Sequence, residues 1–164
     1  MERPVFEKLI RDFWSHLALD APVFDADDEV VLEVDDLDVT LRPGDDDETL
    51  VIEMHVGRLS QDETTRRAEL EKILKLNFAL SPARDTLTVL EPETGGAGTI
   101  LARGFYRTPQ RDFARLADLV ADVISTGETL RMIVADDRLS PHFAGGPGRG
   151  GEPAADADLL ILKP

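Results

Sequence analysis

The sequence predicts an α+β fold in which one antiparallel sheet carries helices packed against it. Two periodicities support this prediction: apolar residues recur every three or four positions in three segments and alternate with other residues in five more. The expected order is helix, three-stranded meander, helix, hairpin and helix, a sandwich followed by a C-terminal tail. With 164 residues, 42% of them hydrophobic, the chain is long and apolar enough to form one compact core.

The opening helix is expected over residues 4–19. Pro4 suits the first turn of a helix, and Asp20-Ala21-Pro22 should end it. Phe13 and Trp14 are neighbours, so they point in different directions and make the apolar arc wider than a single stripe. The residues at helical spacing are Phe6, Leu9, Ile10, Phe13, Trp14 and Leu17.

Three strands should follow as an antiparallel meander over residues 30–34, 37–42 and 50–57. Asp35-Asp36 joins the first two, and residues 42–47 have the composition of a turn before the third. Apolar residues alternate along each strand, which is typical of a sheet with one face on the core. The side chains expected to alternate in this way are Val30, Leu32, Val34, Leu37, Val39, Leu41, Leu50, Ile52, Met54 and Val56.

A second helix should begin at a capping box, Ser60-Gln61-Asp62-Glu63, and run to about Leu80 before Pro82. Its stripe is Leu70, Ile73, Leu74, Asn77 and Phe78.

The remaining elements are a hairpin over residues 86–90 and 99–106 and a last helix. Gly104 should weaken its strand or mark a bulge. Thr108 is the expected N-cap of the last helix, which should end between Gly127 and Val134.

Residues 1–134 are therefore expected to form the domain and residues 135–164 a Gly/Pro-rich tail. The tail ends in an apolar run, Leu159-Leu160-Ile161-Leu162. We expect this run to fold back, as an extra strand or as an occupant of a binding groove.

Charge limits the partners that the chain can bind. Lys and Arg number 18 against 33 Asp and Glu, a net charge of −15, so nucleic acid and anionic membranes would be repelled. Most of this excess lies in residues 20–48, where Arg42 alone opposes thirteen acids. These acids lack the pattern of a calcium loop and are expected in turns and at strand edges, so no metal is predicted.

No catalytic constellation is apparent either. Without cysteine there are no disulfides, thiolate metal sites or thiol nucleophiles. His16, His55 and His142 are scattered, and no serine lies in a nucleophile elbow. The sequence therefore predicts a binding protein without a cofactor rather than an enzyme, and the lack of a signal-like or membrane-spanning segment predicts a cytoplasmic location.

Four features of the sequence point to a known family: the order of elements, the acidity, the stretch from Leu70 to Leu80 and the spacing from Phe113 to Ile124. In these features the chain resembles the class I type III secretion chaperones, also called the CesT or Tir-chaperone family. The resemblance covers residues 4–134. It implies a small acidic homodimer that binds the N-terminal segment of a secreted effector and holds it extended until export without using ATP. Export machinery is a further candidate partner.

The resemblance also implies roles for individual residues. The second helix and later strands would form the dimer interface, with Leu70, Ile73, Leu74 and Phe78 as candidates. The first helix and early strands would supply apolar grooves for the effector, with candidates Phe6, Ile10, Phe13, Trp14, Val31 and Val51. Simple core packing is the alternative for each of these residues, because every apolar stripe must face something.

Two other functions fit the same sequence. One is a regulatory or stress adaptor similar to the YbjN-type proteins, which resemble secretion chaperones. The other is an acidic inhibitor that mimics DNA, although the acids cluster in turns rather than along one extended face.

Overall fold

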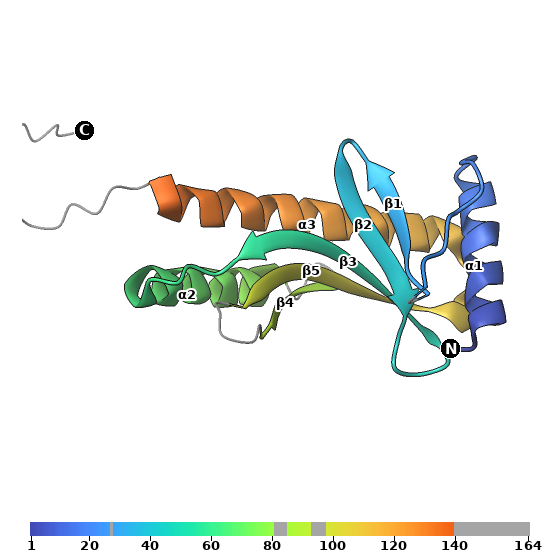
Figure 1. The fold of residues 1–164 in the computed structure, drawn as a ribbon, viewed down its shortest axis with the longest axis horizontal. Helices are drawn as coiled ribbons and strands as arrows, with labels where there is room; N and C mark the ends of the chain where they lie inside the picture. Colours follow the sequence, from blue (N-terminus) through green and yellow to red (C-terminus); the bar gives the residue numbers. More distant parts are fainter. Residues whose placement is uncertain (27, 81–84, 93–97, 140–164) are drawn as a thin grey trace, which may run out of the picture.

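The structure, a computed structural model, describes residues 1–26, 28–80, 85–92 and 98–139 (Figure 1). It confirms the α+β class and the predicted order of elements. The helices are α1 (Arg3–His16), α2 (Glu63–Leu80) and α3 (Phe113–Leu139), with a short 3₁₀ helix at Thr108–Gln110. The strands are β1 (Val30–Val34), β2 (Leu37–Pro43), β3 (Thr49–Arg58), β4 (Thr86–Glu91) and β5 (Thr99–Arg107).

The strands form one antiparallel sheet in the order β1-β2-β3-β5-β4. Asp35 and Asp36 form the two-residue turn between β1 and β2, with φ angles of 50° and 63°. This left-handed pair is what a tight type I′ hairpin requires, and Asp tolerates it better than most residues. β5 inserts between β3 and β4, so the second hairpin joins the meander through its later strand.

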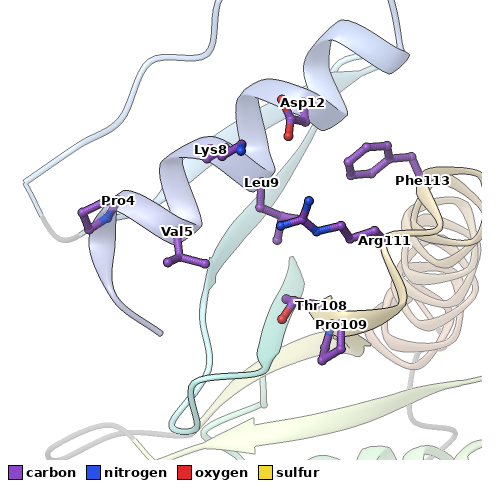
Figure 2. A pocket seen from close by; sticks show the side chains of 9 residues that line it. All are labelled: Pro4, Val5, Lys8, Leu9, Asp12, Thr108, Pro109, Arg111 and Phe113. Atoms are coloured by element: carbon purple, nitrogen blue, oxygen red, sulfur yellow. The ribbon is translucent and has the colours of Figure 1, made fainter.

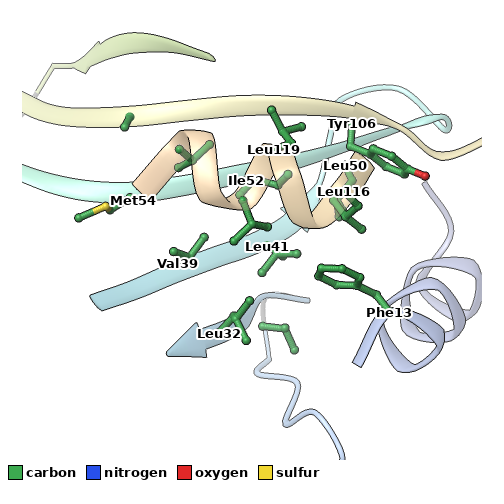
Figure 3. Packing of buried hydrophobic residues seen from close by; sticks show 14 of the residues in the cluster. Phe13, Leu32, Val39, Leu41, Leu50, Ile52, Met54, Tyr106, Leu116 and Leu119 are labelled. Carbon is green, nitrogen blue, oxygen red and sulfur yellow. The ribbon is translucent and has the colours of Figure 1, made fainter. Parts of the chain in front are cut away.

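α3 covers one face of the sheet, which we call the inner face (Figures 1 and 3). Leu50, Ile52 and Met54 alternate along β3 toward this face and are fully buried. A Cβ atom at Gly104 would lie 3.0 Å from side-chain atoms of both Leu119 and Val123. Gly104 therefore lets α3 approach the sheet closely.

The prediction that Gly104 could mark a bulge is therefore wrong, while its effect on the strength of the strand stays a prediction. β5 pairs regularly at this position, with Ile52 on one side and Thr86 on the other. The register shift lies instead in β3, between His55 and Gly57.

α1 closes the end of the sandwich beside β1 and β2 (Figure 1). Its apolar side chains join the same core as the inner face of the sheet. The Phe6 ring lies edge-on to Phe24 at 5.9 Å between centroids, and Phe13 lies 6.1 Å from Phe113 at the start of α3. Aromatic contacts thus tie α1 both to the segment before β1 and to α3.

The predicted ends of the helices need correction. α1 ends at His16 rather than at residue 19, and Ala18 follows with a φ of 55°. Asp62, not Ser60, caps α2, because its carboxylate accepts hydrogen bonds from the Thr65 N–H at 2.8 Å and the Thr65 hydroxyl at 2.7 Å. The Ser60 N–H is taken by the carboxylate of Glu69 at 2.7 Å, so the predicted capping box does not form.

Both ends of α3 also differ from the prediction. Thr108 starts the 3₁₀ helix, and Asp112 caps α3 by accepting from the Arg115 N–H at 3.1 Å. The helix runs through Gly127, where a Cβ would lie 2.5 Å from the Met54 sulfur, and continues to Leu139. It therefore includes residues 135–139, which the sequence assigned to the tail, whereas the run at 159–162 lies outside the described residues.

Candidate protein-binding surfaces

Four of the six predicted partner-binding residues lie on α1 and are buried in this single chain. Phe6, Ile10 and Phe13 have no exposed surface and Trp14 retains 6%. Phe13 and Trp14 contact each other edge-to-face at 5.8 Å, although they face different directions along the helix. The wide apolar arc of α1 is therefore occupied by the chain's own core, and a role of these residues in partner binding stays a prediction.

The other two predicted residues lie on the sheet face opposite α3, which we call the outer face. Val31 in β1 is 56% exposed, whereas Val51 in β3 is 4% exposed. Val51 lies between Arg42 on β2 and Phe105 on β5 in the strand register. Of the pair, only Val31 offers a partner apolar surface without rearrangement.

An ion-pair ladder crosses the outer face beside Val51. Arg42 donates two hydrogen bonds to the Glu53 carboxylate, at 2.9 and 3.1 Å, and these bonds raise the pKa of Arg42 above its usual value. Arg103 also pairs with Glu53 and reaches Glu91 at 2.7 Å. This ladder gives the middle of the outer face a charged surface of mixed sign in a chain that is otherwise strongly acidic.

A groove lies between α1 and the segment that joins β5 to α3, and we call it the α1 groove (Figure 2). Its volume is about 310 Å³, and the exposed Val5 and the buried Leu9 contribute apolar surface from α1. The residues that line it are Pro4, Val5, Lys8, Leu9, Asp12, Thr108, Pro109, Arg111 and Phe113. A hollow of this size with apolar walls suits one or two side chains of a bound segment.

The wall of the α1 groove opposite α1 is fixed by hydrogen bonds. The Thr108 hydroxyl donates to the Glu48 carbonyl at 3.0 Å, and the buried Tyr106 phenol donates to the Asp112 carbonyl at 3.1 Å. Burial raises the pKa of the Tyr106 phenol above its usual value. Arg111 lies between Thr108 and Asp112 in the sequence and has a φ of 44°, a left-handed conformation uncommon outside glycine. Its side chain points into the groove (Figure 2).

The predicted dimer residues on α2 fall into two sets. Ile73 is 2% exposed and Leu70 packs half-buried against the core. Leu74 and Phe78 are 67% and 86% exposed. Phe78 lies one helical turn after Leu74, so the two exposed side chains form an apolar patch that water solvates poorly.

The exposed side of α2 continues onto the sheet through Leu87 and Phe105, which are also exposed. A hollow of about 670 Å³ lies between them and α2, lined by Asn77, Phe78, Asp85, Thr86, Leu87, Phe105 and Arg115. We call Leu74, Phe78, Leu87 and Phe105 the α2 face. Its four large apolar residues come from three elements, and its rim carries the Arg115–Asp85 ion pair at 3.1 Å.

Several of these surface residues were not predicted. Leu87 and Phe105 could have been found from strand alternation, because their neighbours Thr86, Gly104 and Tyr106 face inward. Arg111 could not, since its place beside α1 depends on a contact between segments far apart in the sequence.

In the described part of the chain, no group of three His, Cys, Asp or Glu side chains is arranged to hold a metal ion. None of the helices described there has the length and apolar character needed to cross a membrane.

Comparison with known proteins gives a consistent result. The family model described as the Tir chaperone protein (CesT) family matches residues 8–131, from α1 into α3. The solved structure of the type III secretion chaperone SycH of Yersinia pestis, in complex with a stable fragment of YscM2, is similar with a TM-score of 0.56. That match has 20% identity and covers 76% of this chain and 98% of the other.

Two further solved structures share the fold. A chain of the HopA1–SchA chaperone–effector complex has a TM-score of 0.62 at 15% identity, covering 79% of this chain and 95% of its own length. YbjN of E. coli, described as a putative transcription regulator, has a TM-score of 0.52 at 11% identity, covering 80% and 90%. No curated protein matches the chain.

Proposed function

The chain belongs to the Tir chaperone protein (CesT) family, and on this premise we propose that it is a secretion chaperone and not an enzyme. It binds the N-terminal segment of a type III secreted effector and keeps that segment extended for export without hydrolysing ATP. The observation that carries the proposal is the family match across residues 8–131, which takes in α1 from Lys8 onward, the five strands, α2 and most of α3.

The effector is proposed to bind along α1 and the early strands. The α1 groove accepts apolar side chains, and Val31 on β1 offers a second exposed contact. In the lining of the groove, the two cations Lys8 and Arg111 outnumber the one carboxylate, Asp12, although the chain has a net charge of −15. An apolar segment with a neighbouring acidic residue therefore fits the groove best, because charge complementarity favours that register.

For the α1 residues Phe6, Ile10 and Phe13, which are buried, we propose a supporting part. They hold α1 against the core and so keep the groove in shape, while exposed residues such as Val5 make the contact. Keeping the effector extended requires no nucleotide, because an apolar side chain that is bound to the chaperone cannot pack into a core of the effector itself.

A second copy of this chain is proposed to cover the α2 face. Leu74 and Phe78 supply exposed apolar area, and Leu70 and Ile73 anchor the helix beneath them. A twofold axis beside α2 would bring the α2 faces of both copies together. Twofold symmetry is the commonest symmetry of homo-oligomers.

The effector proposal is tested by titrating the full chain with N-terminal fragments of secreted proteins from its own organism. We expect saturable binding with one fragment, unaffected by ATP. Val5→Asp should weaken it at least about tenfold, because a carboxylate in the apolar groove loses its hydration. The control is Val23→Asp, at a position 86% exposed and outside the α1 groove.

The absence of saturable binding to every secreted fragment would overturn this proposal. Equal affinities of the Val5→Asp and Val23→Asp variants would instead remove the α1 groove as the effector site.

The likeness to YbjN favours a second candidate function, that of a regulatory adaptor. Affinity purification from the native host separates the two: a secreted protein among the captured partners supports the chaperone, whereas regulators alone support the adaptor.

A further inference from the structure

A side chain of α2 is hydrogen-bonded to the outer edge of β4. β4 is an outermost strand of the sheet, and the backbone N–H and C=O groups of every second residue point away from β5. Asn77 on α2 binds both groups of Thr88, the middle residue of that outward set. The Thr88 N–H donates to Asn77 Oδ1 at 2.8 Å, and Asn77 Nδ2 donates to the Thr88 carbonyl at 3.2 Å.

This pair of hydrogen bonds imitates a neighbouring strand. An antiparallel partner would supply one acceptor and one donor to the same two groups, and a carboxamide carries both on one planar unit. Ile73, buried one turn earlier on α2, holds the helix at the distance the amide needs. Asn77 itself is half-buried, which limits competition from water.

The opposite edge of the sheet is different. Within the described residues, the segment before β1 pairs with it only through the bridge between Phe24 and Val30. The rest of β1, residues 31–34, has β2 on one side and no described strand on the other. An unpaired strand edge is a template for any chain that can extend along it.

We infer that Asn77 closes the β4 edge to incoming strands and thereby directs strand addition by a partner to β1. The first half of this inference concerns the chain alone. The second half rests on the proposed function, since it names the edge that an effector segment would use.

The first half is tested on the full chain carrying Asn77→Ala. Exchange of the Thr88 amide hydrogen should quicken at least about tenfold, because both edge groups lose their partner. Sedimentation should show species larger than those of the unmodified chain, formed through the opened edge. Asn77→Asp keeps the acceptor for the Thr88 N–H but loses the donor, so it should protect that amide while still opening the carbonyl.

A matched control separates edge opening from loosening of α2. Ile73→Val shortens the buried anchor and leaves the amide in place, so it should lower the melting temperature without the added self-association. If Thr88 exchange and self-association in Asn77→Ala equal those in Ile73→Val, the inference is overturned.

The second half is tested by amide exchange with an effector N-terminal fragment bound. Protection should rise at residues 31–34 in the unmodified chain and also at β4 in Asn77→Ala. Protection of β4 in the unmodified chain, or of neither edge with the fragment bound, would overturn the assignment to β1. A fragment that does not bind overturns the proposed function, and the exchange and sedimentation results still decide the role of Asn77.

Discussion

α1 and α2 use their apolar residues in opposite ways. α1 buries Phe6, Leu9, Ile10, Phe13 and Trp14 within the chain. Of the large apolar side chains described in α2, only Ile73 is buried, and Leu74 and Phe78 face outward. Both helices show an apolar stripe in the sequence, so a stripe reports that a surface will be covered without saying what covers it.

The contrast separates stability from association. Side chains on α1 contribute to the free energy of folding of one chain. Leu74 and Phe78 contribute little to it, and their apolar area becomes useful only when a second surface covers them.

Phe13→Ala should lower the free energy of unfolding by about 3–5 kcal/mol, because it leaves a cavity between α1, Trp14 and Phe113. Urea denaturation followed by circular dichroism measures this change. Val5→Ala on the same helix is the control and should cost little, since Val5 is exposed. A loss below about 1 kcal/mol for Phe13→Ala would show that α1 is not fixed in the core.

Phe78→Glu should weaken self-association by on the order of 2 kcal/mol or more, roughly thirtyfold, because a buried contact becomes a buried charge. The same change should alter the free energy of unfolding of one chain by less than about 0.5 kcal/mol. Analytical ultracentrifugation across a concentration series gives the first quantity and urea denaturation the second.

Val23→Glu is the matched control for Phe78→Glu, since both side chains are 86% exposed and Val23 lies away from α2. Equal masses for the two variants and the unmodified chain at every concentration would argue that α2 faces water rather than a second copy.

The smallest effect is expected from charges on the exposed side of α2. Lys75 donates to Glu71 at 2.6 Å, and this hydrogen bond and the lysine charge hold the pKa of Glu71 below its usual value. Because the folded pKa is depressed, the pair contributes stability above the ordinary pKa of a glutamate, and the contribution is lost as pH falls through the folded pKa.

Lys75→Ala should therefore raise the pKa of Glu71 toward its usual range, as measured by NMR titration, with little change in melting temperature because both groups are exposed. Lys8→Ala on α1 should leave Glu71 unchanged. A Glu71 titration unaffected by Lys75→Ala would remove the ion pair from the description of α2.

The strands were predictable because each carries a local signal. Leu50, Ile52 and Met54 alternate with Val51, Glu53 and His55 on the outer face, and this period-two pattern favours one orientation of β3 even though Val51 is also buried. The Asp35-Asp36 turn likewise follows from two residues that tolerate the left-handed conformation. The order of elements and the α+β class rest on such signals.

The helix ends were less predictable because distant contacts decide them. Ser60 and Asp62 are both good N-caps; Asp62 caps the helix, and Glu69, nine residues after Ser60, takes the Ser60 N–H that the capping box would need. Gly127 looks like a helix end, yet it continues α3 because the missing side chain leaves room for Met54. Neither reason is visible in the local sequence.

The candidate surfaces were predicted only in part. The sequence pointed to Leu74 and Phe78 on α2 and to Val31 on β1, all exposed in the structure. It could not separate these from Phe6 or Ile73, because burial depends on which elements pack together. The α1 groove needed Lys8 and Arg111 in one place, which only the tertiary fold provides.

α3 follows every other described element in the chain, and it covers the inner face of β3 and β5. A ribosome making this protein therefore releases the strands before the helix that shields Leu50, Ile52 and Met54 exists outside the tunnel. The nascent chain should thus carry an uncovered apolar sheet until α3 emerges. A protein that we propose keeps another chain from collapsing would itself depend, at that stage, on protection from premature contacts.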